Sequence, residues 1–475
     1  MKAMSFLKSL LGVFSGGRAE GPRRPGDPSA ALVEGLEREE VPEWSLVTKY
    51  SVGPVSYMVY RSGDGVLRLL VREPPEPDVR TLVELAAGQR RPSNDVEEYY
   101  MNKERSGYGP LYPLILDPHI EEISYTGMEQ HVAVIHKIAP SRWMLTNIAL
   151  TREQADGIAV ELARKAGKSV NVASPYVEGL TQEGHRVSVS FMSEITRFGS
   201  TFVIRKFPQK PVTIGDLLAS SALTPLMAAY LWLIMEAQGF IIISGPMGSG
   251  KTTLLQGLLT LLPPYVKVIT IEDTPELVVK GPLWDPFITR PRLPGQEVDE
   301  VTLEDLLKFA LRRRADYVVV GEVRGREARL LAQAAASGYG ALTTMHADSP
   351  AGVVMRLTSE PINLPPSFLA SVSAVVQLAR LPGVGGVSSR RVSEIAEVGP
   401  EGPTTVLRWG EKLGVDDVVE RSSRVHWAAE RLGIGDVKDD LEERVAVLED
   451  LAGKGLEEIR ARLVRYYTSK YGDVI

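Results

Sequence analysis

Apolar residues occur along this chain either in short continuous runs or at helical spacing, and the clearest succession of the two lies between residues 212 and 350. Four short apolar runs predict buried strands, at residues 240–244, 266–271, 317–320 and 341–345. Between them the apolar residues take helical spacing, as in the leucines at 254, 255, 258, 259 and 262. Alternating strands and helices predict an open parallel sheet, with the polar residues that end each strand along one edge.

The chain ahead of residue 212 has a different pattern. Two alternating stretches between Tyr50 and Val71 flank Ser62-Gly63-Asp64-Gly65 and predict a hairpin. A capping box at Thr151–Gln154 opens a helix that ends near Gly167, and strand-like runs follow at 186–191 and 201–207. This mixture predicts an α+β domain of ordinary size.

These patterns divide the chain into five segments. We expect a flexible N-terminus (1–42), a small module (43–107), an α+β domain (108–210), a parallel α/β domain (211–410) and a helical C-terminal segment (411–475). Pro208 to Pro211 forms a natural hinge. In the last segment two sets of apolar residues recur at helical spacing, and both predict packing surfaces.

Composition narrows the classes of function. The 475 residues exceed what one core accommodates, and a net charge of −6 argues against a protein that binds nucleic acid over its whole surface. The absence of cysteine excludes disulfides, thiolate catalysis and a cysteine-ligated zinc site, and six histidines give little support to a histidine metal cluster. Lys8 interrupts the apolar N-terminus, so we expect either a short amphipathic helix at a membrane surface or a frayed end, not a signal peptide.

The strongest motif is Gly245-Pro246-Met247-Gly248-Ser249-Gly250-Lys251-Thr252, a full match to G-x-x-x-x-G-K-[ST] between a predicted strand and a predicted helix. Its glycines let backbone N–H groups surround a polyphosphate, and the following helix N-terminus, from Thr253 on, favours negative charge. Lys251 is expected to bind the β- and γ-phosphates of ATP, and the Thr252 hydroxyl to ligate Mg²⁺.

Acidic residues end two of the predicted strands. Glu272 and Glu276 follow one strand and Glu322 follows another, where Gly321 occupies the position at which P-loop enzymes usually carry an aspartate. We expect Glu272 to activate the attacking water and Glu322 to act through Mg²⁺, with Glu276 and Glu322 as the other candidates for the base. His346 ends a fourth strand and is either structural or a sensor of the γ-phosphate.

An ATPase also needs positive charge at the γ-phosphate. Arg186 and Arg205 lie on predicted strands ahead of the hinge, but spacing alone does not favour them over Arg197.

Together these segments resemble the secretion ATPase superfamily, the motors of type II secretion, type IV pili, archaeal flagella and type IV secretion. The matching segments, in chain order, are GPMGSGKTT (245–253), ITIEDTPEL (269–277), LRRRADYVVVGEVRGREA (311–328) and GYGALTTMHAD (338–348). Glycine at position 321 is itself usual in this family. Segments 111–127, 184–191 and 200–207 resemble its N-terminal domain, and the likeness, over about residues 95–400, favours the archaeal branch.

The resemblance implies an α/β fold in which a PAS-like α+β N-terminal domain precedes a RecA-like P-loop ATPase domain with a helical C-terminal tail. It also implies a homohexamer that binds ATP and Mg²⁺ between the two domains of a subunit. Such a motor drives a polytopic membrane platform protein at the cytoplasmic face of the membrane. The resemblance also implies that Arg186 and Arg205 contact the γ-phosphate of ATP.

Two other functions remain open from the sequence. A conjugation or DNA-transfer ATPase would use a related core, although the acidic balance and the lack of an aromatic-basic stretch make nucleic acid an unlikely partner. A nucleotide-binding scaffold without hydrolysis is disfavoured because the acids, the histidine and the P-loop occur together.

Overall fold

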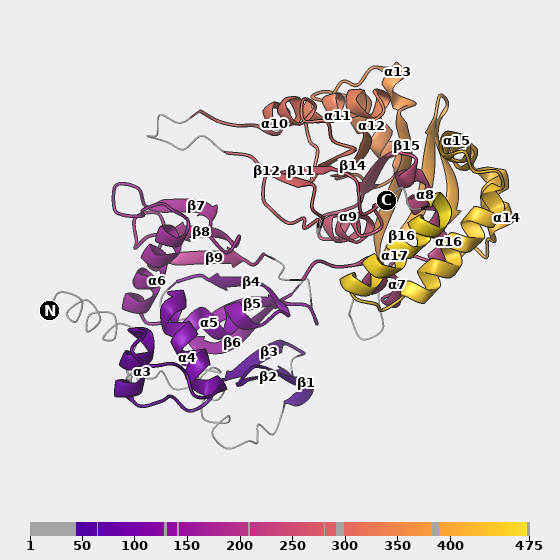
Figure 1. Ribbon diagram of the computed structural model, residues 1–475. Coiled ribbons are helices and arrows are strands. Elements are labelled where there is room, and N and C mark those ends of the chain that lie inside the picture. Colours follow the sequence, from indigo (N-terminus) through magenta and orange to yellow (C-terminus); the bar gives the residue numbers. More distant parts are fainter. Residues whose placement is uncertain are drawn as a thin grey trace. The chain divides into compact units, whose positions relative to one another are not determined.

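The computed structural model describes residues 44–472 except 64, 128–130, 140–141, 208–209, 280, 291–298 and 382–388 (Figure 1). The chain divides into two compact units, Met1–Gln209 and Lys210–Ile475, here called the first and second units. Each is a mixed α/β unit built on its own sheet, which confirms the α/β fold class. The segment expected to be a flexible N-terminus, 1–42, and residues 208–209 of the expected hinge lie outside the described residues.

The first unit contains a nine-stranded sheet in the order β1-β2-β3-β6-β5-β4-β9-β8-β7. Its strands are β1 (Ser45–Val52), β2 (Val55–Arg61), β3 (Leu67–Arg72), β4 (Ile120–Tyr125), β5 (His131–His136), β6 (Trp143–Ala149), β7 (Tyr176–Leu180), β8 (Arg186–Ser190) and β9 (Thr201–Arg205). Its helices are α3 (Val79–Ala86), α4 (Asp95–Ser106), α5 (Tyr112–Leu116) and α6 (Arg152–Lys165), with a 3₁₀ turn η1 (Gly109–Leu111). The capping box at Thr151 that opens α6 is present as expected.

Residues 43–107 do not form the separate module that the sequence suggested. Strand β3 pairs in parallel with β6, through Arg68 with Leu145 and Leu69 with Thr146. Tyr57 and Leu69 belong to the same buried core as Ile123. Local patterning predicted the strands but carried no signal for this pairing, because parallel partners are distant in sequence.

The stretch from Tyr50 to Tyr60, expected as one alternating strand, instead contains a turn. Strands β1 and β2 pair around Gly53 and Pro54, and Gly53 takes a φ of 56°, which glycine adopts without strain. Proline lacks the N–H that a continuous strand would need for pairing.

The second unit contains an eight-stranded sheet in the order β12-β11-β13-β14-β10-β15-β16-β17. Its strands are β10 (Phe240–Ser244), β11 (Val268–Glu272), β12 (Trp284–Ile288), β13 (Tyr317–Val320), β14 (Gly340–Met345), β15 (Val372–Leu381), β16 (Ser389–Gly399) and β17 (Gly402–Arg408). The four strands that the sequence predicted, β10, β11, β13 and β14, pair in parallel as expected. The sequence analysis missed β12 and β15, which extend the parallel part, and the antiparallel hairpins that β15, β16 and β17 form.

Helices cover both faces of this sheet, so its central strands are buried on both sides. On one face Ile241 and Ile243 pack in a core with α8 (Pro225–Glu236) and α9 (Lys251–Leu259). On the other, Phe240 and Ile242 pack with helices α10 (Leu303–Ala310), α11 (Glu327–Ala336) and α12 (Pro350–Thr358). Successive residues of a strand point to opposite faces, which explains why every residue of β10 is apolar except its last.

The remaining helices extend the first of these two cores (Figure 1). They are α7 (Ile214–Ala219), α14 (Val415–Arg421), α15 (Ser423–Leu432), α16 (Val437–Leu451) and α17 (Leu456–Tyr471), while the short α13 (Pro366–Leu369) lies against the opposite core. Leu441 of α16 and Ile459 of α17 are fully buried in the core that contains α8. Among the described residues no helix is long and apolar enough to span a bilayer.

One charged side chain is completely enclosed where α16 meets α8. The Arg444 guanidinium lies 2.7 Å from Glu236 and 2.7 Å from Asp440, and 4.7 Å above the ring of Trp232. Both carboxylate side chains are 5% exposed, so each charge depends on its partner for solvation.

We therefore expect Arg444→Ala to destabilise the second unit by about 3–5 kcal/mol, because the buried Glu236 carboxylate loses its counter-charge. Urea unfolding followed by tryptophan fluorescence would measure this loss. The matched control is Arg421→Ala, whose pair with Glu411 at 3.3 Å is half-exposed and should cost about 1 kcal/mol or less. An Arg444→Ala protein as stable as the control would show that the enclosed pairs contribute little.

Candidate active site

Three chemically active side chains and the P-loop meet at one edge of the second sheet. Strands β11, β13, β14 and β10 are parallel neighbours, so their carboxyl ends lie side by side. Glu272 is the last residue of β11, Glu322 follows β13, His346 follows β14 and the P-loop follows β10. This position outside the carboxyl ends of parallel strands is where α/β sheets bind ligands.

The P-loop glycines stand where other residues would be strained. Gly245, Gly248 and Gly250 have φ values of 156°, 67° and 93°. A Cβ on Gly245 would lie 2.7 Å from the Ser249 hydroxyl and 3.0 Å from the carbonyl oxygen of Leu378. The loop can take this path only with glycine at these positions.

The other P-loop residues differ in exposure. Pro246 and Met247 are exposed, whereas Thr252 and Thr253 at the start of α9 are half-buried. Ser249 is buried, and its hydroxyl has no hydrogen-bond partner among the described residues. Because a buried hydroxyl normally has a partner, this loop is suited to a ligand with hydrogen-bonding oxygens.

The ammonium group of Lys251 is enclosed by the loop and by β14. Its Nζ donates to the carbonyl oxygens of Gly245 and Pro246, at 3.2 and 3.3 Å, and lies 3.1 Å from His346 Nδ1. Burial lowers the pKa of Lys251, although the charge of Glu322 opposes this. The cation thus faces three acceptors, which match its three protons.

His346 continues a chain of polar contacts from Lys251 to Glu322. Since an ammonium group only donates, Nδ1 of His346 accepts, and its other nitrogen, Nε2, lies 3.0 Å from Glu322 Oε1. Burial and the neighbouring Lys251 lower the pKa of His346, which favours the neutral ring. Arg324 donates to the other carboxylate oxygen of Glu322 at 2.6 Å.

The carboxyl group of Glu272 lies in a buried turn. Its Oε1 accepts from the backbone N–H groups of Glu276 and Leu277, at 2.9 and 3.0 Å, and burial raises its pKa to about 7. A Cβ on Gly321 would lie only 3.2 Å from the Glu272 Cγ. Because Gly321, which follows β13, has no side chain, there is space for the Glu272 side chain at the end of β11.

Glu276 also remains close to the P-loop. Its charge is one of those that raise the pKa of Lys251, and its side chain is half-buried. Both carboxylates thus lie near the same edge, and Glu272 is the more deeply buried of the two.

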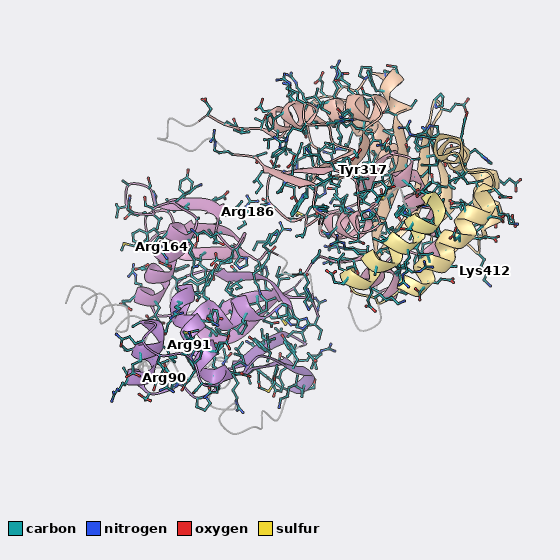
Figure 2. The ribbon with its side chains drawn as sticks, in the orientation of Figure 1. Arg90, Arg91, Arg164, Arg186, Tyr317 and Lys412 are labelled. Carbon is teal, nitrogen blue, oxygen red and sulfur yellow. The ribbon has the colours of Figure 1, made fainter. Side chains whose placement is uncertain are left out.

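Arg186 and Arg205 lie together in the first unit. They are directly opposite each other on β8 and β9, with side chains half exposed and 3.6 Å and 3.8 Å from Glu178 and Glu122. Figure 2 labels Arg186 on β8. Arg197 belongs to the loop at the other end of this hairpin, with its guanidinium over Phe198. Each arginine thus has an acidic neighbour, and their cross-strand placement brings two cations to the same end of the hairpin.

The sequence analysis missed two residues that hold the backbone at His346. Gln377 on β15 accepts from the Ser244 hydroxyl at 2.5 Å and donates to the Ala347 carbonyl at 3.2 Å, and Arg356 on α12 donates to the His346 carbonyl. Gln377 could have been noticed as the polar residue that interrupts the apolar run of residues 374–379.

Comparison with known proteins assigns the family. The model of the family described as "Type II/IV secretion system protein" matches residues 180–385, which contain the P-loop and all five candidate catalytic side chains. The chain belongs to the type II/type IV secretion ATPase superfamily.

Relatives occur in archaea and bacteria. Two uncharacterized proteins of Methanocaldococcus jannaschii are similar: MJ0900, 35% identical over 63% of this chain and 54% of its own length, and MJ1287, 37% identical over 54% of this chain and 99% of its own length. The putative conjugal transfer protein Rv3659c of Mycobacterium tuberculosis is 28% identical over 62% of this chain and 86% of its own. The chain thus spans about half of MJ0900.

The residues at this sheet edge fit a nucleotide with Mg²⁺. In the described ranges no group of three or more acidic or histidine side chains could hold a metal ion. Mg²⁺ usually takes one or two protein ligands and completes its shell with phosphates and water, so Thr252 and Glu322 suffice as candidates.

We expect Gly321→Asp to lower the rate of ATP hydrolysis by about a hundredfold, because the new side chain displaces Glu272 and places a second carboxylate beside it; a lost general base typically costs about 10²–10⁴-fold. Phosphate release would measure the rate. Gly321→Ala, which adds only the Cβ, is the control and should lose less. Wild-type hydrolysis in the Asp variant would show that Gly321 serves no such purpose.

The raised pKa of Glu272 predicts a pH dependence. A general base must be deprotonated, so kcat/KM should fall as pH drops below about 7, instead of below the range of an ordinary glutamate. Glu272→Gln should lose turnover, and Glu276→Gln should keep the wild-type fall of kcat/KM at low pH. If Glu276→Gln abolished this fall at low pH while Glu272→Gln left it intact, the base would be Glu276.

Proposed function

We propose that this protein is a hexameric ATP-hydrolysing motor that powers type II secretion or the assembly of a type IV pilus- or archaellum-like filament. The observation that carries the proposal is the chain of contacts from Lys251 through His346 to Glu322, which joins the P-loop to the carboxylate that follows β13. A protein that only bound nucleotide would not need this connection. The family assignment supports the same conclusion.

The residues divide the chemistry among them. The P-loop backbone and Lys251 hold the phosphates, and Thr252 with Glu322 provide the ligands for Mg²⁺. When bound, Mg²⁺ supplies positive charge that neutralises the phosphate oxygens. Glu272 accepts a proton from the attacking water, which it can do near neutral pH because its pKa is about 7. His346 reports the state of the γ-phosphate to Lys251 and Glu322.

The first unit supplies the arginines in this proposal. We assign residues 108–210, within the first unit, as the PAS-like part and 211–410 as the RecA-like domain, with ATP bound between them and the C-terminal helices as a tail. Arg186 and Arg205 then contact the γ-phosphate, and the release of this phosphate after hydrolysis frees one domain from the other. Their cross-strand placement supports this, because two arginines opposite each other on neighbouring strands can both bind one phosphate group.

The partners follow from the family. We propose a homohexamer at the cytoplasmic face of the membrane, acting on a polytopic membrane platform protein. The second candidate is a DNA-transfer ATPase, favoured by the likeness to a putative conjugal transfer protein. Stimulation of ATP hydrolysis by single-stranded DNA, but not by vesicles that contain a platform protein, would favour the second candidate over the first.

We expect Arg205→Gln to lower the rate of ATP hydrolysis by about 10³-fold or more, as the loss of an arginine finger does, and to leave ADP affinity unchanged because ADP has no γ-phosphate. Arg186→Gln should behave alike. Arg197→Gln is the matched control, since it removes the same charge from the opposite end of the hairpin. Steady-state hydrolysis and ADP titrations provide both readouts.

The same variants test the motor itself. Solution scattering should show that a non-hydrolysable ATP analogue compacts the wild-type protein and the Arg197→Gln variant but not Arg205→Gln. An Arg205→Gln protein that hydrolyses ATP and compacts like wild type would show that Arg205 of the first unit takes no part in hydrolysis or closure.

A further inference from the structure

Strand β15 continues past the end of the P-loop strand and runs beside the P-loop. In the parallel pairing of β10 with β15, Ser244 lies opposite Gln377. Gly245 then leaves the sheet to form the loop, whereas β15 extends through Leu378 to Arg380. On its other side Arg380 is paired with Arg390 of the antiparallel strand β16.

Both arginines point to the face of the sheet that α9 covers. Leu378 and Val392 belong to the core that contains the leucines of α9. Arg380 and Arg390 are each two residues away from one of these, and residues two apart on a strand share a face. They therefore lie where α9 begins, which is also where the P-loop ends.

Contacts with the loop agree with this placement. Arg380 Nε donates to the carbonyl oxygen of Gly248 at 3.2 Å, and a Cβ on Gly248 would collide with the guanidinium. The Arg390 Cδ is 3.5 Å from the position that a Cβ on Gly250 would take. Thus each arginine lies against one of the P-loop glycines.

The catalytic acids and the two arginines lie on opposite sides of the P-loop. Glu322 and Glu272 follow strands on the β14 side, whereas Arg380 and Arg390 lie on the β15 side. Like charges directly opposite in a sheet are destabilising, and Arg380 forms no ion pair within the described part of the chain. An anion beside Gly248 would therefore give Arg380 a counter-charge.

We propose that Arg380 and Arg390 bind the phosphate chain of the nucleotide from the side opposite to the catalytic acids. The inference rests on the proposed ATPase function and adds two phosphate-binding cations supplied by the second unit itself. Because the γ-phosphate is assigned to the side of Lys251, His346 and Glu322, these arginines contact the phosphates shared by ATP and ADP. They set the affinity for both nucleotides, whereas Arg205 acts on ATP alone.

The test is a titration of the full-length protein with a fluorescent ADP and a fluorescent non-hydrolysable ATP analogue, in the presence of Mg²⁺. Arg380→Gln and Arg390→Gln should each raise the Kd for both nucleotides by about tenfold to a hundredfold, the usual effect of losing a charged hydrogen bond. Arg380→Lys should recover most of the affinity. Added salt should weaken ADP binding less in the Gln variants than in wild type, since fewer charges are then screened.

The control is Arg408→Gln on β17, an exposed arginine paired with Glu394 at 3.5 Å, which should bind as wild type. Unchanged ADP affinity in both Arg380→Gln and Arg390→Gln would overturn the inference. If Arg380→Gln lost affinity but Arg380→Lys recovered none, Arg380 would act by holding Gly248, and the proposed charge contact would be wrong. Failure of the wild-type protein to bind either nucleotide would instead refute the proposed ATPase function.

Discussion

The whole site depends on the burial of β10. All five residues of this strand are buried, with β14 and β15 on either side and a hydrophobic core on each face. A strand held on four sides cannot shift without opening both cores, so the P-loop that follows it starts from a fixed point. Lys251 depends on this constraint, because its contacts with Gly245, Pro246 and His346 exist only if β10 and β14 keep their register.

The charged and polar side chains differ between the two sides of the P-loop. On the β14 side a neutral histidine separates the Lys251 cation from the Glu322 carboxylate, and Glu272 fills the space that Gly321 leaves. On the β15 side the charges are arginines. A phosphate chain lying between the two sides would meet proton acceptors at one end and cations along the rest, as hydrolysis of a phosphoanhydride requires.

The sequence predicted the parts of this arrangement that depend on local pattern. Strands β10 and β13 have the predicted bounds, and the four groups at the sheet edge were found because each follows a buried apolar run. It did not predict the β15–β17 hairpins or the parallel pairing of β3 with β6, since these depend on pairing between distant residues. Nor did it find Gln377, Arg356 or Arg380, whose contacts with the site arise only when β15 and α12 are in place.

The most direct test of the account is ATP turnover by the purified full-length protein and by its Lys251→Ala variant, measured as phosphate release in the presence of Mg²⁺. Lys251 carries the positive charge at the centre of the site, and its loss removes the main contact with the β- and γ-phosphates. The account predicts hydrolysis by the wild-type protein and none above background by the variant, with the variant still folded. Equal rates in the two proteins would contradict it.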